Sequence, residues 1–240
     1  MARRFKGITD TGVLRSVNQD DFYIDPDGRF CIVADGMGGH AGGQEASRIA
    51  TTTIRTYLDE NWEAEIGSDE LLEKAIWEAN QDIIDDQDTH PERADMGTTV
   101  VVLLFRDGEP WCGHIGDSRF YRLRGEDLEQ ITEDQTWVAR AMKMGDLSPE
   151  DARNHPWRHV LSQCLGRRDL QRLDVQRVDI QGGDRCLLCS DGLTEEVENS
   201  QILAQLLAEP DGEVAIQALV EVAKNNGGSD NITIVIVDED

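Results

Sequence analysis

Five aspartates in this 240-residue chain have the side-chain chemistry and the spacing expected of a functional site. Four of them share one pattern, a position where an apolar strand ends or begins: Asp35, Asp117, Asp191 and Asp230. Asp20 is a candidate fifth. Any single aspartate at such a position is more often a turn former or a helix cap. Four in one pattern indicate a cluster of carboxylates.

A converging cluster of carboxylates predicts bound cations. Two like charges about 4 Å apart repel by about 4 kcal/mol at an effective dielectric near 20. Ligands that are all oxygen suit Mg²⁺ or Mn²⁺ better than Zn²⁺. Two such cations lower the pKa of a bound water and hold phosphoryl oxygens. Arg15 lies five residues before Asp20 in a polar stretch, and its planar guanidinium could bind a phosphate with two hydrogen bonds.

The glycine-rich stretch after Asp35 allows other interpretations. Residues 36–41 (G-M-G-G-H-A) fit the loose G-x-G-x-x-A pattern of dinucleotide-binding loops, which keeps a nucleotide-binding redox domain as an alternative. Two features argue against it, because Asp35 would face a pyrophosphate and no second acid-ended strand follows about 20 residues later. A plain turn is the other alternative, since glycine adopts positive φ at no steric cost.

Apolar patterning predicts the elements that position these aspartates. We expect strands over 4–9, 30–34, 173–180, 185–190 and 232–237, and a run of antiparallel strands after residue 97. We expect helices over 43–60, 69–87, 200–208 and 212–225, with Ser68 as the N-cap of the second. This order predicts one α+β domain over residues 1–240, with two sheets faced by helix pairs. Residues 134–166 contain broken helical pieces and predict a surface excursion.

Composition limits the classes of partner and compartment. A formal charge of −25 disfavours nucleic acid and anionic membranes as partners. No apolar run is long enough to span a bilayer, and the N-terminus lacks an apolar signal region. The five scattered cysteines favour reduced thiols in the cytoplasm. Cys186 and Cys189 have C-x-x-C spacing, but on a strand they face opposite sides and are expected in the core.

Six ordered segments cover almost the whole chain: 15–20 (R-S-V-N-Q-D), 33–40 (V-A-D-G-M-G-G-H), 96–99 (M-G-T-T), 114–118 (H-I-G-D-S), 188–193 (L-C-S-D-G-L) and 228–231 (G-S-D-N). Through them the chain resembles bacterial metal-dependent protein serine/threonine phosphatases, the type-2C or PPM family. Residues 30–58 and 134–166 resemble cyanobacterial members most, one of which acts on the PII nitrogen-signalling protein. The resemblance implies a central β-sandwich of two antiparallel sheets flanked by antiparallel helix pairs.

The resemblance also implies a dinuclear Mg²⁺ or Mn²⁺ centre at one end of the sandwich. In it, Asp35 bridges both metals and the Gly36 carbonyl binds the second. Asp191 and Asp230 hold the first metal, and Asp20 acts mostly through bound waters.

Further roles follow from the same resemblance. Asp117 and Asp191 are expected to form a weaker third metal site, and Arg15 to hold the substrate phosphate. Residues 134–166 correspond to the flap beside the active site. The whole of 1–240 is then a single phosphatase domain that contains this flap subdomain.

Two positions depart from the family pattern. Many eukaryotic members have histidine at the position of Met37, where it is the usual candidate for the general acid, and His40 is the nearest replacement. Bacterial relatives commonly have histidine at the position of Gln135. His114, on an apolar strand, is expected to be structural.

We therefore expect an enzyme that hydrolyses phosphoserine and phosphothreonine in proteins by attack of a metal-bound hydroxide, with no phosphoenzyme. The alternative is a catalytically weak relative that binds phosphoproteins, although the complete set of acids argues against it. We expect a cytoplasmic monomer that acts on phosphoproteins, with a PII-type signalling protein or kinase targets as the candidates.

Overall fold

The protein is described from a computed structural model, which describes residues 3–39, 41–153, 155–170 and 173–239. Within these residues the strands form two antiparallel sheets. One sheet has the order β1-β11-β10-β7-β8. Its strands are β1 (Arg3–Asp10), β11 (Ile232–Glu239), β10 (Arg185–Cys189), β7 (Arg119–Arg124) and β8 (Asp127–Gln130).

The second sheet has the order β2-β3-β5-β6-β9, and β4 pairs with the end of β3. Its strands are β2 (Asp20–Ile24), β3 (Phe30–Met37), β4 (Gly97–Thr98), β5 (Val100–Arg106), β6 (Glu109–Ile115) and β9 (Asp174–Arg177). The antiparallel pairing removes the dinucleotide-binding alternative, since that fold needs parallel strands.

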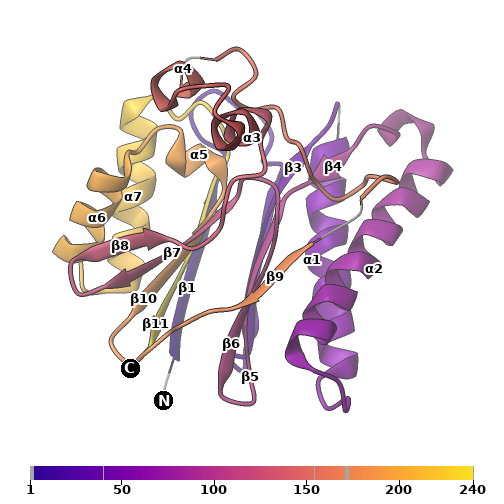
Figure 1. Cartoon of the computed structure of the whole chain (residues 1–240), viewed down its shortest axis with the longest axis horizontal. Coiled ribbons are helices and arrows are strands. Elements are labelled where there is room, and N and C mark those ends of the chain that lie inside the picture. The colour runs from indigo at the N-terminus through magenta and orange to yellow at the C-terminus, as the bar shows by residue number, and fades with distance from the viewer. Residues whose placement is uncertain (1–2, 40, 154, 171–172, 240) are drawn as a thin grey trace.

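Helix pairs cover the outer faces of the two sheets (Figure 1). On the second sheet lie α1 (Gly42–Asn61) and α2 (Ser68–Thr89), the latter followed by the short η1 (Pro91–Arg93). Beside the first sheet lie α6 (Asn199–Ala208) and α7 (Gly212–Asn226), preceded by the short α5 (Asp191–Thr194). The predicted flap contains α3 (Trp137–Met144) and α4 (Pro149–Arg153), which lie over one end of the sheets (Figure 1). The two-sheet α+β prediction is confirmed.

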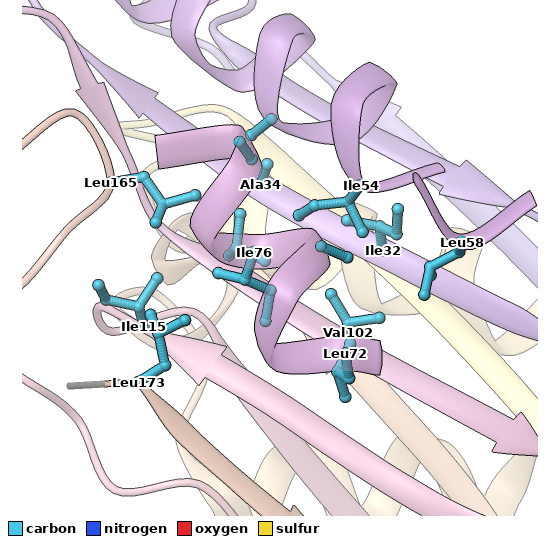
Figure 2. Close-up of a cluster of buried hydrophobic side chains, with 14 of the residues drawn as sticks. Ile32, Ala34, Ile54, Leu58, Leu72, Ile76, Val102, Ile115, Leu165 and Leu173 are labelled. Carbon is cyan, nitrogen blue, oxygen red and sulfur yellow. The ribbon is translucent and has the colours of Figure 1, made fainter. Parts of the chain in front are cut away.

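Three apolar clusters build these layers. The first joins α1 and α2 to the second sheet, where Ile54 and Ile76 pack near Ile32 and Val102 (Figure 2). The second joins α6 and α7 to the first sheet, and the third lies between the sheets. Side chains along β3 alternate between the two faces of the sheet: Ile32 belongs to the helix-facing cluster and Val33 to the cluster between the sheets.

The cysteine predictions agree with these layers. All five cysteines lie within the described residues and are buried with free thiols. Cys186 belongs to the cluster between the sheets, whereas Cys189 faces α6 and α7. The C-x-x-C spacing therefore serves packing on two faces of β10.

Strand β3 extends further than the sequence analysis predicted. Instead of ending at residue 34, it continues through Asp35 and Gly36 because β4 pairs with its last residues. Here the backbone passes very close to the start of α1. A Cβ added at Gly36 would lie 1.9 Å from the Gly43 carbonyl oxygen, so only glycine fits this position.

Three smaller predictions were also wrong in detail. Ser68 is the first residue of α2, and the N-cap is Gly67 with no side-chain hydrogen bond. Strand β9 covers only Asp174–Arg177, not 173–180. Asp191 does not simply end a strand, because it opens the short helix α5. Among the described residues, none of the helices is both long and apolar enough to cross a membrane.

Candidate metal centre

The two sheets bring the predicted aspartates together at the end of the sandwich that the flap covers. Asp20 and Asp35 are register partners on β2 and β3. Asp191 follows β10, and Asp230 precedes β11, the strand that pairs with β10. Asp117 lies in the turn between β6 and β7, which connects the two sheets.

Asp20 is held by hydroxyl groups from the opposite sheet. Its Oδ2 accepts hydrogen bonds from Ser190 Oγ and Thr233 Oγ1, each at 2.7 Å. Its Oδ1 is buried and has no partner among the described residues. Burial raises the pKa of Asp20 to about 7, although the two hydroxyl groups oppose this change. Asp20 is thus fixed in place with one oxygen still available.

Asp35 is held through its backbone. The Asp35 N–H donates to Thr99 Oγ1 at 3.0 Å, and the Asp35 carbonyl accepts from Thr98 Oγ1 and the Thr99 N–H, both at 2.9 Å. Burial, followed by the charges of Asp20 and Asp191, raises the pKa of Asp35 well above its usual range. The β-strand therefore fixes the main chain of Asp35 and leaves its carboxyl group facing other acids.

The side chain of Asp191 lies close enough to that of Asp35 for each carboxyl group to affect the pKa of the other. Its Oδ1 is another buried oxygen without a partner in the described residues. Burial raises the pKa of Asp191, and the nearby Asp230 adds to that increase. Asp117 is affected in the same way, since burial and then the charge of Asp191 raise its pKa well above normal.

Asp230 is partly exposed, with 32% of its side chain accessible. Its Oδ2 accepts a 2.6 Å hydrogen bond from Arg15 Nη2, and its Oδ1 accepts one from the Asn231 N–H at 2.8 Å. The Arg15 side chain is 52% exposed and stays accessible for a ligand. The structure therefore brings Arg15 to the same site as the aspartates.

Asn231 explains how Arg15 reaches this position. Its amide nitrogen donates to the carbonyls of Thr11 and Val17, each at 3.0 Å, and its Oδ1 accepts from the Gln19 N–H at 2.7 Å. These three hydrogen bonds fasten the loop between β1 and β2, which carries Arg15, to the start of β11. No role for Asn231 was predicted from the sequence.

Glu195 and His159 also belong to this site, and the sequence analysis missed both. His159 of the flap contacts Glu195 through Nδ1, and ligand atoms of these two residues and Asp191 lie within 4.8 Å of one another. Burial, then the charge of Asp191, raises the pKa of Glu195 to about 7. The sequence spacing could have identified Glu195, because this residue lies four positions after Asp191, one helical turn away.

A cavity of about 950 Å³ lies between the flap and α5. Asp117 and Asp191 line it together with Glu195, and the flap contributes Met142 and Arg158. Asp117, Asp191 and Glu195 therefore face a space large enough for part of a substrate.

The remaining residues considered in the sequence are His40, Gly36 and His114. His40 lies outside the described residues. Gly36 follows Asp35 directly in β3. His114 is 2% exposed on β6, and burial lowers its pKa, so it is a neutral core residue. Its Nε2 has no hydrogen-bond partner within the described ranges.

Comparisons with known proteins agree with this geometry. The sequence model of the protein phosphatase 2C family matches residues 14–220. The chain is 36% identical to the serine/threonine protein phosphatase PstP of Mycobacterium tuberculosis over 98% of its own length and 45% of that relative. It is 37% identical to the protein phosphatase PhpP of Streptococcus pneumoniae, with 96% of this chain and 95% of that protein covered.

A solved structure is similar over nearly the whole chain. The catalytic domain of PstP in complex with two manganese ions superposes with a TM-score of 0.86 at 34% identity, covering 99% of both chains. The chain thus spans about half the length of the mycobacterial relative and matches its catalytic domain. It belongs to the protein phosphatase 2C family.

Proposed function

We propose that this chain hydrolyses phosphoserine and phosphothreonine in proteins at a centre of two Mg²⁺ or Mn²⁺ ions. One observation carries the proposal. Burial, together with the negative charge of neighbouring carboxylates, raises the pKa of Asp20, Asp35, Asp117 and Asp191. At neutral pH such a cluster is stable as a set of anions only with cations among the carboxylates.

The donor set fits hard divalent cations. The five acids offer carboxylate oxygens, and two of these, Asp20 Oδ1 and Asp191 Oδ1, are buried without a hydrogen-bond partner in the described residues. Oxygen ligands are those that Mg²⁺ and Mn²⁺ prefer. PstP was crystallised with two manganese ions. When bound, two such ions lower the pKa of a water between them and neutralise phosphoryl oxygens.

We assign the ligands as the family resemblance implies. Asp35 would serve as a ligand shared by both ions, and the Gly36 carbonyl would be a ligand of the second. Asp191 and Asp230 would hold the first, and Asp20 would act mostly through bound water. Asp117 and Asp191 would together hold a weaker third ion.

Arg15 orients the substrate. Its exposed guanidinium lies at the rim of the centre and can hold the phosphate through two N–H groups. His40 remains our proposal for the group that protonates the leaving alkoxide.

The flap offers a surface for the protein part of the substrate. Trp137 stacks on His155 with ring centroids 4.9 Å apart, and the edge of Trp157 meets Trp137 at 5.0 Å. Trp157 is 54% exposed. Arg140 and Arg158 are exposed and form no ion pair with any described residue. Exposed aromatic rings beside unpaired arginines suit a phosphoprotein.

The remaining assignments are part of the same proposal. Residues 1–240 form one phosphatase domain that acts as a monomer in the cytoplasm, an assignment supported by the five buried, reduced cysteines. Its substrates are proteins phosphorylated by kinases, with a PII-type signalling protein as one candidate.

The test is hydrolysis of a phosphoserine peptide and of a small aryl phosphate by protein stripped with a chelator. We expect no phosphate release until Mn²⁺ or Mg²⁺ is added. Undiminished turnover in metal-free protein would contradict the proposed chemistry. Tight peptide binding without hydrolysis at any metal concentration would instead support the catalytically weak alternative.

A further inference from the structure

The first two residues of the flap, Asp134 and Gln135, form hydrogen bonds on both sides of the turn that contains Asp117. Asp134 accepts two hydrogen bonds from Arg119, from Nε at 2.9 Å and from Nη2 at 2.7 Å. Gln135 binds Gly116 twice, since its N–H donates to the Gly116 carbonyl at 2.8 Å and its Oε1 accepts from the Gly116 N–H at 3.0 Å. Asp117 lies between these two anchored neighbours.

Gln135 is itself held from two directions. Its Nε2 donates to Asp174 Oδ2 on β9 at 2.8 Å. Its carbonyl accepts from the N–H and the hydroxyl of Ser162, at 2.8 and 2.9 Å, at the other end of the flap. The Gln135 side chain therefore connects the Asp117 turn to the edge of the second sheet, and its backbone connects the start of the flap to the flap's end and to the same turn.

The turn needs such support because its backbone is unusual. Gly116 has φ of +101°, and a Cβ there would lie 2.6 Å from Thr99 Cγ2. On the far side, Ser118 Oγ and Thr99 Oγ1 lie 2.6 Å apart, and Thr99 also accepts from the Asp35 N–H. The backbone of the turn that carries Asp117 is thus held by Gln135 on one side and, through Thr99, by the Asp35 strand on the other.

We propose that Gln135 is a positioning residue that fixes Asp117 and so couples attachment of the flap to cation binding at the Asp117 site. This inference rests on the proposed function, because it takes Asp117 as a ligand of the weaker third cation. It assigns no contact with substrate or metal to Gln135 itself.

The amide chemistry of Gln135 allows a sharp test. Glutamate at this position would still accept from Gly116 but would face the Asp174 carboxylate, whereas asparagine in place of Asp174 would restore a donor. The variants are Gln135→Ala, Gln135→Glu, Asp174→Asn and the double change Gln135→Glu with Asp174→Asn. Gln176→Ala is the matched control, because the side chain of this β9 glutamine donates, among the described residues, only to the Ile131 carbonyl at 3.3 Å.

The readout is Mn²⁺ binding to metal-free protein by titration calorimetry, with thermal melting of the same samples. Wild-type protein should show tight sites and a weaker class. Gln135→Ala and Gln135→Glu should weaken the weaker class at least tenfold with the tight sites unchanged. Asp174→Asn and Gln176→Ala should bind as wild type does, and the double variant should recover most of the loss.

Three results would overturn the inference. They are absence of a weaker class in wild type, an unchanged weaker class in both Gln135 variants, and a double variant no better than Gln135→Glu. A lower melting temperature with unchanged Mn²⁺ binding would show that Gln135 only anchors the flap. Metal-dependent phosphopeptide hydrolysis by wild type is measured alongside, so the proposed function can stand when the inference fails.

Discussion

The guanidinium of Arg15 donates a 2.6 Å hydrogen bond to Oδ2 of Asp230. The residue proposed to hold phosphate is thus paired with a residue proposed to hold metal. Both side chains are partly exposed, so the pair adds little to stability. A cation on Asp230 would compete for the same carboxylate and leave Arg15 available for a phosphate.

Arg15→Ala should raise KM while kcat changes little. The arginine contacts a phosphate that is present in both the ground state and the transition state, so its loss removes uniform binding. A charged hydrogen bond of about 1.5–3 kcal/mol corresponds to an increase in KM of roughly tenfold to a hundredfold. Steady-state kinetics on peptide and aryl phosphates checks this, with Arg15→Lys as an intermediate control. An unchanged KM on both substrates would mean that Arg15 does not bind the phosphate.

Asp35→Asn and Asp117→Asn should differ in degree. Loss of the bridging carboxylate at Asp35 should lower kcat by at least about a thousandfold, the scale of losing a principal electrostatic element. Asp117→Asn should keep activity but need more Mn²⁺ for half-maximal rate. Metal titrations of activity distinguish the two, and equal losses in both variants would contradict separate roles for the two carboxylates.

The metal-free protein should lose stability as pH rises from about 4 to 7. An unfolded aspartate has a pKa near 3.9, whereas burial raises the pKa of folded Asp20 to about 7. Between these values the folded state binds more protons than the unfolded state, so the free energy of unfolding falls with increasing pH. Denaturant unfolding of wild type and Asp20→Asn at several pH values measures the difference.

The control is the same measurement at saturating Mn²⁺. The free energy of unfolding should then decrease less with rising pH, because cations stabilise the ionised carboxylates. If wild type and Asp20→Asn keep the same stability difference from pH 4 to 7 without metal, the carboxylate is not held in a buried cluster.

Substitutions on the flap should separate recognition from chemistry. Trp157→Ala and Arg140→Ala should lower kcat/KM for a phosphoprotein several-fold and leave hydrolysis of a small aryl phosphate within about twofold. Lys143→Ala should do less, because its ammonium group already pairs with Glu133 at 2.8 Å. Leu207→Ala on α6, also an exposed apolar residue, is the matched control. Equal losses on both substrates would show that the flap shapes the metal centre instead.

Apolar patterning predicted most of the fold because both faces of the central strands are buried. Runs such as 100–105 have no alternation, which is typical of strands covered on both sides. The boundaries were less predictable where a tertiary contact decides them. Strand β3 continues past Asp35 only because β4 pairs with it. Asp191 begins the helix α5, which has only four residues and is too short to show a helical pattern in the sequence.

The convergence of the aspartates was predictable because they recur at strand ends, but the residues that fix them were not. Ser190 and Thr233 both hold Asp20 from the sheet opposite its own, and nothing in their local sequence points to a residue far away in the chain. Gln135 was noted only as a departure from a family pattern. Its link to Gly116 needs the geometry of the turn.

Titration calorimetry of Mn²⁺ into metal-free wild type and Asp35→Asn tests the central claim most directly. If the buried aspartates form the cation centre, wild type binds two ions tightly, and the Asp35→Asn variant loses this binding while remaining folded. Tight binding of two ions that is the same in both proteins, or no binding in wild type, would contradict the account.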